Sequence, residues 1–378
     1  MRILHIGLGS HFTENMTYQD NVLTEMNAKQ GHSVVYVADC YIYRDCRIEY
    51  VGEEDRVLDN GVRMIRIDYD HIINEFVSDR IRKSRKLKRL LLQIHPETIM
   101  FHGLLSYELI TVAEYSKEKN IPLYADCHAD YFNTARTSFS KLVYKIVYKP
   151  IIWKSLAEIK KILYVGKGTR QFLQDLYKIP EEKLEFYPLG GILQSKIKQK
   201  QCKEKLIADL NLSDDVIICT HSGKLTKEKR TKDLMEAFIS VQNTRLCLII
   251  LGSVPDEEYA DFMELVKSDK RIHFLGWKKE KEMADILCAT DLYLQPGSQS
   301  STAQMALCCG CAEAVFPTES YKELYGNNVI YISCKKNIKT VFHRALTEEN
   351  YLQYYKETGY NLAKDILDYE KLAMRYLR

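Results

Sequence analysis

VIICTHSGKLTKEKR, residues 216–230, predicts a buried strand that turns directly into a helix. The first five residues are apolar or β-branched, as in strands buried on both faces of a parallel sheet. Gly223 interrupts this pattern, and a charged segment leads into a helical pattern over 229–239. Strand, turn and helix form the repeating unit of α/β proteins, so the stretch favours a parallel sheet with crossover helices.

The same alternation runs through both halves of the chain. In the first half, strand patterns cover 3–7, 33–38, 62–67, 98–101, 122–126 and 162–165, and helical patterns cover 18–30, 75–94, 107–119, 140–159 and 169–177. The second half adds strand patterns over 216–220, 246–251, 272–275, 292–294, 312–315 and 329–332, and helical patterns over 229–239, 256–266, 281–288 and 301–308. Two such sets predict an α/β protein with two Rossmann-like, doubly wound parallel-sheet domains.

The length also favours two domains, because 378 residues exceed what one hydrophobic core usually supports. The charged segment around 192–212 lacks a strand pattern and is the expected linker. We therefore expect an N-terminal domain over 1–195 and a C-terminal domain over 210–354. The helical end of the chain, 355–378, is expected to cross back and complete the first domain.

The composition excludes several classes of protein. The chain is 46% apolar and 28% charged, as globular proteins are, and its net charge of +3 is too small to favour nucleic acid as a partner. No segment approaches the roughly 20 consecutive apolar residues of a membrane span. Eleven cysteines without a signal-peptide pattern favour a reducing, cytoplasmic setting.

Cys308, Cys309 and Cys311 form a cluster that suggests zinc at first sight. No Cys or His pairs with zinc-ligand spacing accompany them, so no metal site is expected. We interpret these cysteines as small apolar side chains packed around Gly310.

Two basic segments lie in the first half. RIRKSRKLKR runs from Arg80 to Arg89, and an amphipathic stretch runs from Lys141 to Lys161. A solvated helix face is one interpretation of each. The other is attraction to an anionic membrane surface or to a phosphorylated substrate.

The loops after strands are the candidate sites, because ligands of doubly wound sheets bind at the carboxyl ends of the strands. Lys224 and Lys229 follow the first strand of the second domain and can converge on one diphosphate, although scattered surface lysines are the simpler interpretation. A later loop has the composition of a helix N-cap or anion site in Ser298, Gln299, Ser300, Ser301 and Thr302. Ammonium groups facing a helix N-terminus suit a nucleotide-activated substrate.

In the first domain, Gly9 follows the first strand and would let a ligand approach the backbone closely. The third glycine of a dinucleotide-binding motif is missing, which argues against NAD. The following helix begins with polar residues that could bind sugar hydroxyls, although capping or solvent contact explains them equally well: Glu14, Asn15, Tyr18 and Gln19.

Two histidines end strands of the first domain. His128 lies between Asp126 and Asp130, which favours a functional role over a purely structural hydrogen bond. His102 is a candidate ligand contact.

These motifs, in this order, resemble the GT-B glycosyltransferases of family 4, of the type that assembles bacterial capsule, lipopolysaccharide and exopolysaccharide. GKLTKEK at 223–229 resembles the family motif G-R-L-x-x-x-K, with Lys224 in place of arginine. The other matching segments are GHSV at 31–34, PLGG at 188–191, IILG at 249–252, IHFLG at 272–276, ATDLYLQP at 289–296 and CG at 309–310. The ordered set covers nearly the whole chain.

The resemblance implies two domains facing a central cleft, with donor binding in the second and acceptor binding in the first. It implies that Gly223, Lys224 and Lys229 bind the donor diphosphate, and that His128 lies beside the reacting sugar. It also implies a UDP-sugar donor, retention of anomeric configuration and no metal. The acceptor would be a saccharide, free or lipid-linked, which places the cytoplasmic protein at the inner face of the membrane.

One departure from the family concerns the nucleotide ribose. The family has two glutamates eight residues apart, and this chain has Gly297 and Met305 at those positions. Methionine is a poor hydrogen-bond acceptor, so Gln304 or a nearby group would have to replace the carboxylate. The missing acids leave two alternatives open: a non-catalytic sugar-nucleotide-binding subunit, and a sugar-nucleotide 2-epimerase.

Overall fold

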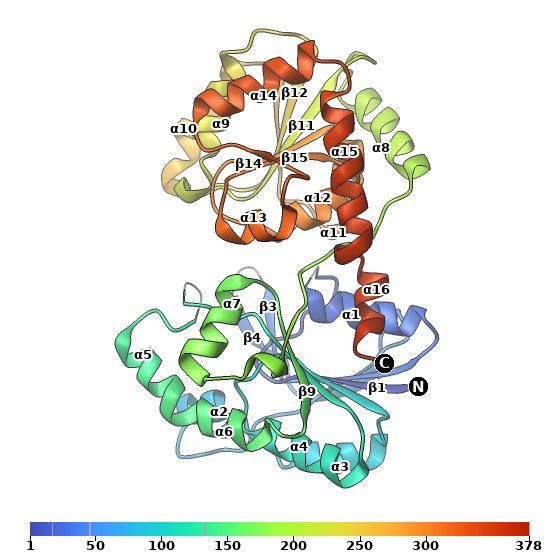
Figure 1. The fold of residues 1–378 in the computed structure, drawn as a ribbon, viewed down its shortest axis with the longest axis vertical. Coiled ribbons are helices and arrows are strands. Elements are labelled where there is room, and N and C mark those ends of the chain that lie inside the picture. Colours follow the sequence, from blue (N-terminus) through green and yellow to red (C-terminus); the bar gives the residue numbers. More distant parts are fainter. Residues whose placement is uncertain (17, 45–46, 132–133, 378) are drawn as a thin grey trace. The chain divides into compact units, whose positions relative to one another are not determined.

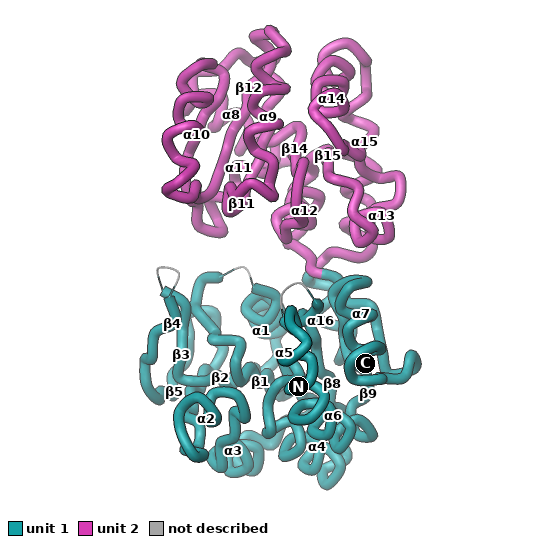
Figure 2. The backbone as a smooth tube through the Cα atoms, turned by 90° about the vertical axis from the view of Figure 1, so that its left-hand side faces the viewer, with its two compact units in different colours: residues 1–188, 369–378 teal, residues 189–368 magenta. Residues whose placement is uncertain are grey.

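The computed structural model describes residues 1–16, 18–44, 47–131 and 134–377. It divides into two compact units (Figure 2). Unit 1 consists of Met1–Pro188 and Tyr369–Arg378, and unit 2 consists of Leu189–Asp368. Each unit is a largely parallel sheet with helices on both faces, which confirms the predicted α/β fold class (Figure 1).

Unit 1 has the strand order β10-β9-β8-β7-β1-β2-β6-β5, in which only β5 runs antiparallel to its neighbour. Its strands are β1 (Arg2–Gly7), β2 (Ser33–Ala38), β5 (Glu54–Val57), β6 (Arg63–Arg66), β7 (Thr98–Phe101), β8 (Leu123–Cys127), β9 (Ile159–Tyr164) and β10 (Leu184–Phe186), with β3 (Tyr41–Arg44) and β4 (Arg47–Tyr50) paired separately. Its helices are α1 (Gln19–Lys29), α2 (Glu75–Ile81), α3 (Lys86–Ile94), α4 (Glu108–Lys119), α5 (Ser138–Val143), η1 (Tyr144–Tyr148), α6 (Lys149–Ser155), α7 (Lys167–Phe172), η2 (Leu173–Tyr177), η3 (Glu181–Lys183) and α16 (Tyr369–Arg375).

Unit 2 has the strand order β13-β12-β11-β14-β15-β16, all parallel. This is the arrangement of dinucleotide-binding sheets, whose order reverses between the first and fourth strands. Its strands are β11 (Ile217–Lys224), β12 (Leu246–Ser253), β13 (Ile272–Gly276), β14 (Leu292–Gln295), β15 (Ala312–Val315) and β16 (Ile330–Tyr331). Its helices are α8 (Lys196–Asp209), η4 (Lys227–Lys229), α9 (Thr231–Ile239), α10 (Asp256–Ser268), α11 (Glu280–Ala289), α12 (Ser301–Cys308), α13 (Glu319–Tyr325), α14 (Lys335–Thr347), α15 (Tyr351–Leu362) and η5 (Ala363–Leu367).

The structure corrects the position of the linker. Most of the segment 192–212 is helical: it forms α8, which packs on α11. The boundary between the two units lies earlier in the chain, after Pro188. Apolar side chains near the end of α8, Leu206 and Leu210, pack against the unit 2 core. In the sequence, the lysine-rich segment 196–205 that precedes these residues hides their helical pattern.

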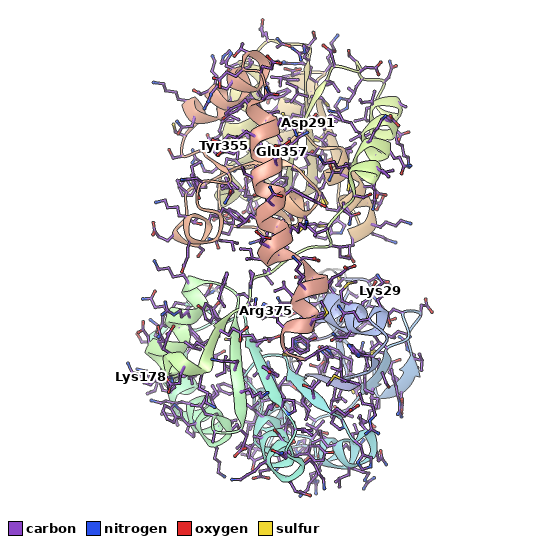
Figure 3. The ribbon with its side chains drawn as sticks, turned by 45° about the vertical axis from the view of Figure 1, so that its right-hand side comes forward. Lys29, Lys178, Asp291, Tyr355, Glu357 and Arg375 are labelled. Carbon is purple, nitrogen blue, oxygen red and sulfur yellow. The ribbon has the colours of Figure 1, made fainter. Side chains whose placement is uncertain are left out.

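The C-terminal crossing is also shorter than the predicted 355–378. Helix α15 packs on β15 within unit 2, and the Tyr360 hydroxyl donates to the Gln194 carbonyl at 3.0 Å. Only the chain from Tyr369 onward belongs to unit 1. There Arg375, on α16 (Figure 3), donates to the Phe186 carbonyl at 2.8 Å and so fastens α16 to the edge strand β10.

The helix predicted over 75–94 is interrupted. Arg82 adopts the left-handed conformation (φ 51°) and ends α2, and α3 begins only at Lys86. The Arg82 guanidinium turns inward and donates to the Leu105 carbonyl at 3.2 Å. This tertiary contact stabilises a break that the continuous helical pattern does not indicate.

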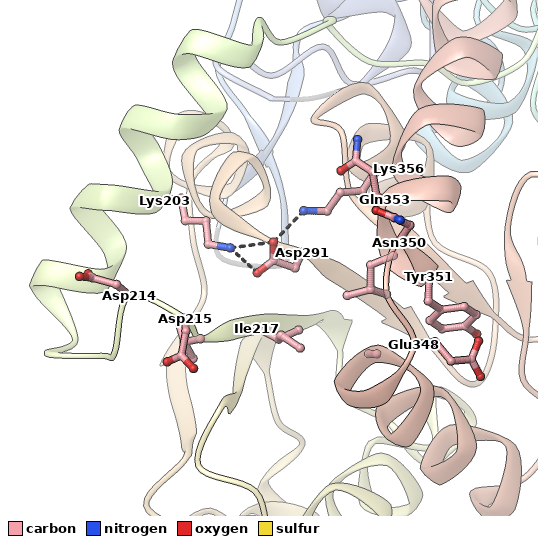
Figure 4. Close-up of a pocket in the computed structure, with 13 residues that line it drawn as sticks. Lys203, Asp214, Asp215, Ile217, Asp291, Glu348, Asn350, Tyr351, Gln353 and Lys356 are labelled. Atoms are coloured by element: carbon pink, nitrogen blue, oxygen red, sulfur yellow. Dashed lines mark hydrogen bonds and ion pairs between the residues drawn. The ribbon is translucent and has the colours of Figure 1, made fainter.

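A buried carboxylate holds the amino edge of the unit 2 sheet together. Asp291 precedes β14 and accepts hydrogen bonds from Lys203 of α8 (2.7 and 2.8 Å) and from Lys356 of α15 (2.7 Å) (Figure 4). It also accepts the Ile218 N–H of β11 at 2.9 Å. Burial would raise the pKa of Asp291, but the two ammonium groups outweigh burial and lower it. The pocket of about 580 Å³ in Figure 4 is lined by Asp291 and its two lysine partners, at the edge of the sheet opposite the carboxyl ends of the strands.

We expect Asp291→Ala to reduce the free energy of unfolding by about 3 kcal/mol, because it leaves two partly buried ammonium groups without their counter-charge. Chemical denaturation of the full chain at pH 7 measures this loss. The stabilisation belongs to the ionised carboxylate, so it should fade as the pH falls below the usual aspartate range and through the lowered pKa. Asp365→Ala, which removes an exposed carboxylate from the same unit, is the control and should change stability by less than about 0.5 kcal/mol.

Candidate functional site

The candidate site of unit 2 lies where the strand order reverses, between β11 and β14. These strands are parallel neighbours, so the loops that follow them leave the same edge of the sheet side by side. Lys224 ends β11 and Lys229 lies in the connection that follows it, whereas the loop after β14, residues 296–300, leads into α12. The structure therefore brings together the two segments that the sequence analysis singled out.

Lys229 is the centre of this arrangement. Its ammonium donates to the carbonyl oxygens of Gln299 (2.8 Å) and Ser298 (3.2 Å), immediately before α12. The side chain passes over Gly223, where an added Cβ would lie 3.3 Å from the Lys229 Cε atom. Half-burial lowers the pKa of Lys229 to about 8. The site thus holds a cation, poorly solvated, at the positive end of a helix dipole.

The loop before α12 is fixed by close backbone contacts. The Ser298 N–H donates to the Glu228 carbonyl at 2.8 Å, and an added Cβ at Gly297 would lie 2.0 Å from that same oxygen. Gly297 is thus required for packing, where the family carries a glutamate. The Ser300 hydroxyl caps α12 by accepting the Thr302 N–H at 3.4 Å. The loop is therefore held against the Lys229 segment before any ligand binds.

Three adjacent strands carry a glycine at or next to their carboxyl ends, beside this site. Gly223 of β11 lies opposite Gly252 of β12, and Gly276 ends β13 next to Leu251. An added Cβ would meet the Lys229 side chain at Gly223 and the Gly223 carbonyl oxygen at Gly252, whereas the space at Gly276 is open. A flat group can therefore approach the backbone closely at Gly276. Trp277, the residue after Gly276, is 66% exposed at the same edge.

The predicted donor contacts Lys224 and Gln304 differ in their exposure. Lys224 is exposed at the very end of β11, one residue beyond Gly223. Gln304 is buried, and with its amide correctly turned it donates to the carbonyls of Ser300 and Ser301 on its own helix, at 3.1 Å each. Gln304 therefore does not replace the missing glutamate in this structure.

In unit 1, His128 follows β8 and is accessible. Its side chain is 43% exposed, and its Nε2 atom lies 3.9 Å from Oδ1 of the buried Asp126. An exposed imidazole next to a fixed carboxylate can orient a polar substrate or exchange a proton with it.

The structure corrects three predicted contacts of unit 1. His102 is buried, and both of its ring nitrogens are engaged, with Asp126 and His5. Gln19 is also buried and donates to the Pro188 carbonyl at 3.1 Å. The space above Gly9 is filled by a protein side chain, since an added Cβ would lie 2.1 Å from the Arg82 guanidinium.

The remaining predicted acceptor contacts lie at the surface of unit 1. Glu14 is paired with Arg56, Asn15 is exposed in the left-handed conformation (φ 61°), and Tyr18 is exposed at the start of α1.

The cysteine cluster is apolar, as the sequence indicated. Cys308, Cys309 and Cys311 are buried in one hydrophobic cluster of unit 2, and burial raises the pKa of Cys308. Among the residues that the structure describes, no three His, Cys, Asp or Glu side chains gather where they could hold a metal ion. Nor does the described part of the chain contain a helix long and apolar enough to cross a membrane.

Two models of known protein families match the sequence of this chain. The family model Glycosyltransferase Family 4 matches residues 21–190, and the model Glycosyl transferases group 1 matches residues 202–362. Together they cover most of the chain. The chain belongs to the GT-B glycosyltransferases. No curated protein matches this glycosyltransferase in sequence.

Solved structures share the fold of this glycosyltransferase over its full length. Anabaena HepE in complex with UDP has a TM-score of 0.66 at 12% identity, covering 99% of this chain and 98% of its own. A glycosyltransferase from Rickettsia africae has a TM-score of 0.70 at 12% identity, covering 100% and 96%. WaaG, a glycosyltransferase involved in lipopolysaccharide biosynthesis, has a TM-score of 0.59 at 13% identity, covering 99% of each chain. At these identities the likeness establishes the fold.

Arg230, which in the sequence is only one charge among many, braces the loop over 296–300 in this glycosyltransferase. The Arg230 guanidinium donates to the carbonyls of Ser333 (2.9 Å) and Pro296 (3.4 Å) and pairs with Asp233. The left-handed conformation of Arg230 (φ 55°) at the start of α9 directs it there. Its position directly before a helix was a weak signal for this role.

We expect Gly252→Ala to destabilise the glycosyltransferase by at least about 3 kcal/mol. Gly252 has a φ of 129°, and an added Cβ would lie 1.8 Å from the Gly223 carbonyl oxygen. Gly326→Ala is the matched control, because Gly326 also has a positive φ (53°) but open space around it, so only about 1 kcal/mol should be lost. Equal losses in thermal unfolding would show that backbone strain, and not contact with β11, sets the requirement.

Proposed function

We propose that this glycosyltransferase is a retaining, metal-independent hexosyltransferase that moves a sugar from a UDP-sugar to a saccharide acceptor in surface polysaccharide assembly. The observation that carries the donor half is the Lys229 ammonium, held on the carbonyls that precede α12. Together with the helix N-terminus, this cation would stabilise the negative charge of the departing diphosphate, which is the task that a metal ion performs in other enzymes.

The nucleotide would occupy the edge beside this cation. The open backbone at Gly276 offers a close approach for a base, and Trp277 next to it offers an exposed aromatic face for stacking. Anabaena HepE was solved with UDP and with UDP-glucose, which supports a uridine nucleotide. Retention is proposed from the resemblance to family 4, and NMR of the product's anomeric signal tests it.

In this proposal His128 is the catalytic residue of unit 1 and contacts the reacting sugar. Incubation of the purified chain with UDP-sugars and a saccharide acceptor, followed by mass spectrometry, tests the activity. Tight UDP binding without hydrolysis or transfer would favour the non-catalytic subunit. Conversion of a UDP-sugar into its 2-epimer without an acceptor would favour the epimerase.

We expect Lys229→Ala to weaken UDP binding at least tenfold, because charge-assisted hydrogen bonds contribute about 1.5–3 kcal/mol. Isothermal titration calorimetry measures the affinity, and Lys227→Ala, an exposed lysine two residues away, is the control. A lysine whose pKa is lowered to about 8 is charged below that pH and loses its charge above it. UDP affinity should therefore fall above pH 8 in the native chain and stay level in Lys229→Arg. Unchanged affinity in Lys229→Ala would overturn the diphosphate role.

We further propose that the acceptor is lipid-linked and that unit 1 contacts the anionic face of the membrane. The continuous helical segment α5–η1 exposes Phe139 (76%) and Ile146 (64%), with Leu142 between them on the same side of the helix. A row of lysines flanks this apolar stripe: Lys141, Lys145 and Lys149. Apolar side chains bordered by lysines are typical of helices that lie in a bilayer interface.

The basic run from Arg80 to Arg89 offers fewer free positive charges for membrane contact than its composition suggests. Arg85 and Lys86 are paired with Asp70 and Glu53, and Arg82 points inward. Arg80 itself is exposed on α2, and its carbonyl accepts the hydroxyl of the buried Tyr148 of η1 at 2.8 Å, so α2 packs against the buried side of this helical segment.

We expect the chain to co-sediment with phosphatidylglycerol-containing vesicles and much less with phosphatidylcholine vesicles. The double variant Phe139→Ser, Ile146→Ser should weaken this binding at least tenfold, because burying one such side chain contributes about 1.5–3 kcal/mol. Ile197→Ser, which removes an equally exposed apolar side chain from α8, is the control. If it reduces binding as much as the double variant does, the α5–η1 surface is not the membrane contact.

A further inference from the structure

A line of hydrogen-bonded side chains crosses the interior of unit 1 and ends next to His128. His5 on β1 contacts His102 after β7 (Nδ1 to Nε2, 2.9 Å), and His102 contacts Asp126 on β8 (Nδ1 to Oδ2, 2.5 Å). At the other end, His5 Nε2 lies 3.0 Å from the Asn27 side-chain oxygen on α1. The three strands β1, β7 and β8 are adjacent, so neighbouring strands supply successive members of the line.

The partners at both ends fix the direction of every hydrogen bond. The Asn27 amide nitrogen donates to the Ala373 carbonyl at 3.1 Å, so the Asn27 oxygen faces His5 and must accept from His5 Nε2. Burial, followed by the nearby His102, lowers the pKa of His5 to about 3, so His5 is neutral and its Nδ1 accepts. His102 therefore donates from both ring nitrogens, to His5 and to Asp126.

The centre of the line is thus an ion pair of imidazolium and carboxylate. Burial opposes the charge on His102, but Asp126 outweighs it and raises the His102 pKa. Burial likewise opposes the charge on Asp126, and His102 keeps the Asp126 pKa below its usual value. The negative charge of Asp20 on α1 also raises the His102 pKa. Asp20 accepts a hydrogen bond from the hydroxyl of Tyr36, whose ring stacks on His102.

Asp126 carries this arrangement to the surface. Its Oδ1 atom accepts the Gly103 N–H at 2.8 Å and lies 3.9 Å from Nε2 of His128. With Oδ2 bound by His102, the carboxylate has one orientation, and only Oδ1 is directed toward His128.

We propose that His102 and His5 are positioning residues, which hold Asp126 ionised and in one orientation so that Asp126 orients the exposed imidazole of His128. The inference rests on the proposed function only where it assigns His128 to the reacting sugar. No group other than these side chains is required, since Asp126 acts as a fixed carboxylate and exchanges no proton with His128.

The first test is independent of activity and uses the full chain labelled with ¹⁵N-histidine. We expect His102 to be doubly protonated at pH 7.5, where an ordinary histidine is neutral, and His5 to be neutral. His102→Asn keeps an N–H directed at Asp126 and should preserve the ring signals of His128, whereas His102→Leu should shift them. A neutral His102 at pH 7.5, or an unshifted His128 in His102→Leu, would overturn the proposal.

The second test uses transfer kinetics. We expect His102→Leu to lower kcat at least tenfold while UDP affinity stays unchanged, and His102→Asn to recover most of this loss. His343→Leu, an exposed histidine of unit 2, is the control. Equal losses in the Leu and Asn variants would indicate a merely structural role and overturn the proposal. If the native chain transfers no sugar, the proposed function fails, and the NMR experiment still decides the inference. If His102→Leu does not fold, the NMR experiment still tests the inference, because the protonation of His102 and His5 is measured in the native chain.

Discussion

A single half-buried ammonium group organises the candidate site of unit 2. Lys229 has lost part of its hydration, and the carbonyls of Ser298 and Gln299 replace it. This requires the loop after β14 to lie against the loop after β11, which in turn requires Gly297 and Gly223 to leave room. The glycines, the cap of α12 and the bracing by Arg230 all follow from seating one charge at a helix N-terminus.

In unit 1 the important charges are buried. Its central ion pair, His102 with Asp126, lies in the interior, and a carboxylate oxygen faces the surface beside His128. Breaking a buried ion pair is costly because the remaining charge has no solvent. The sheet of unit 1 can therefore present a carboxylate of fixed charge and direction, which an exposed aspartate would not provide.

Periodicity identified the buried elements well and the polar ones poorly. The central strands are continuous apolar runs, and β2, β7 and β15 have the bounds that their patterns predict. Strands β3, β4, β5 and β10 were missed, and of these β4 and β5 read RIEY and EDRV, where charged residues obscure a strand pattern. Helix α8 was missed for the same reason, because it is lysine-rich and only a few apolar side chains near its C-terminal end pack on the core.

The sequence by itself determined the fold class and the segments that form the candidate site of unit 2, because turn residues and apolar runs are local signals. It placed Lys229 and the Ser298 loop at strand ends, and β11 and β14 then brought them together. Only the tertiary structure decided which side chains are available. His102, Gln19 and Gln304 have the same chemistry as surface ligands but are buried. Burial depends on which strands become neighbours, and that contact is long-range and leaves no local pattern.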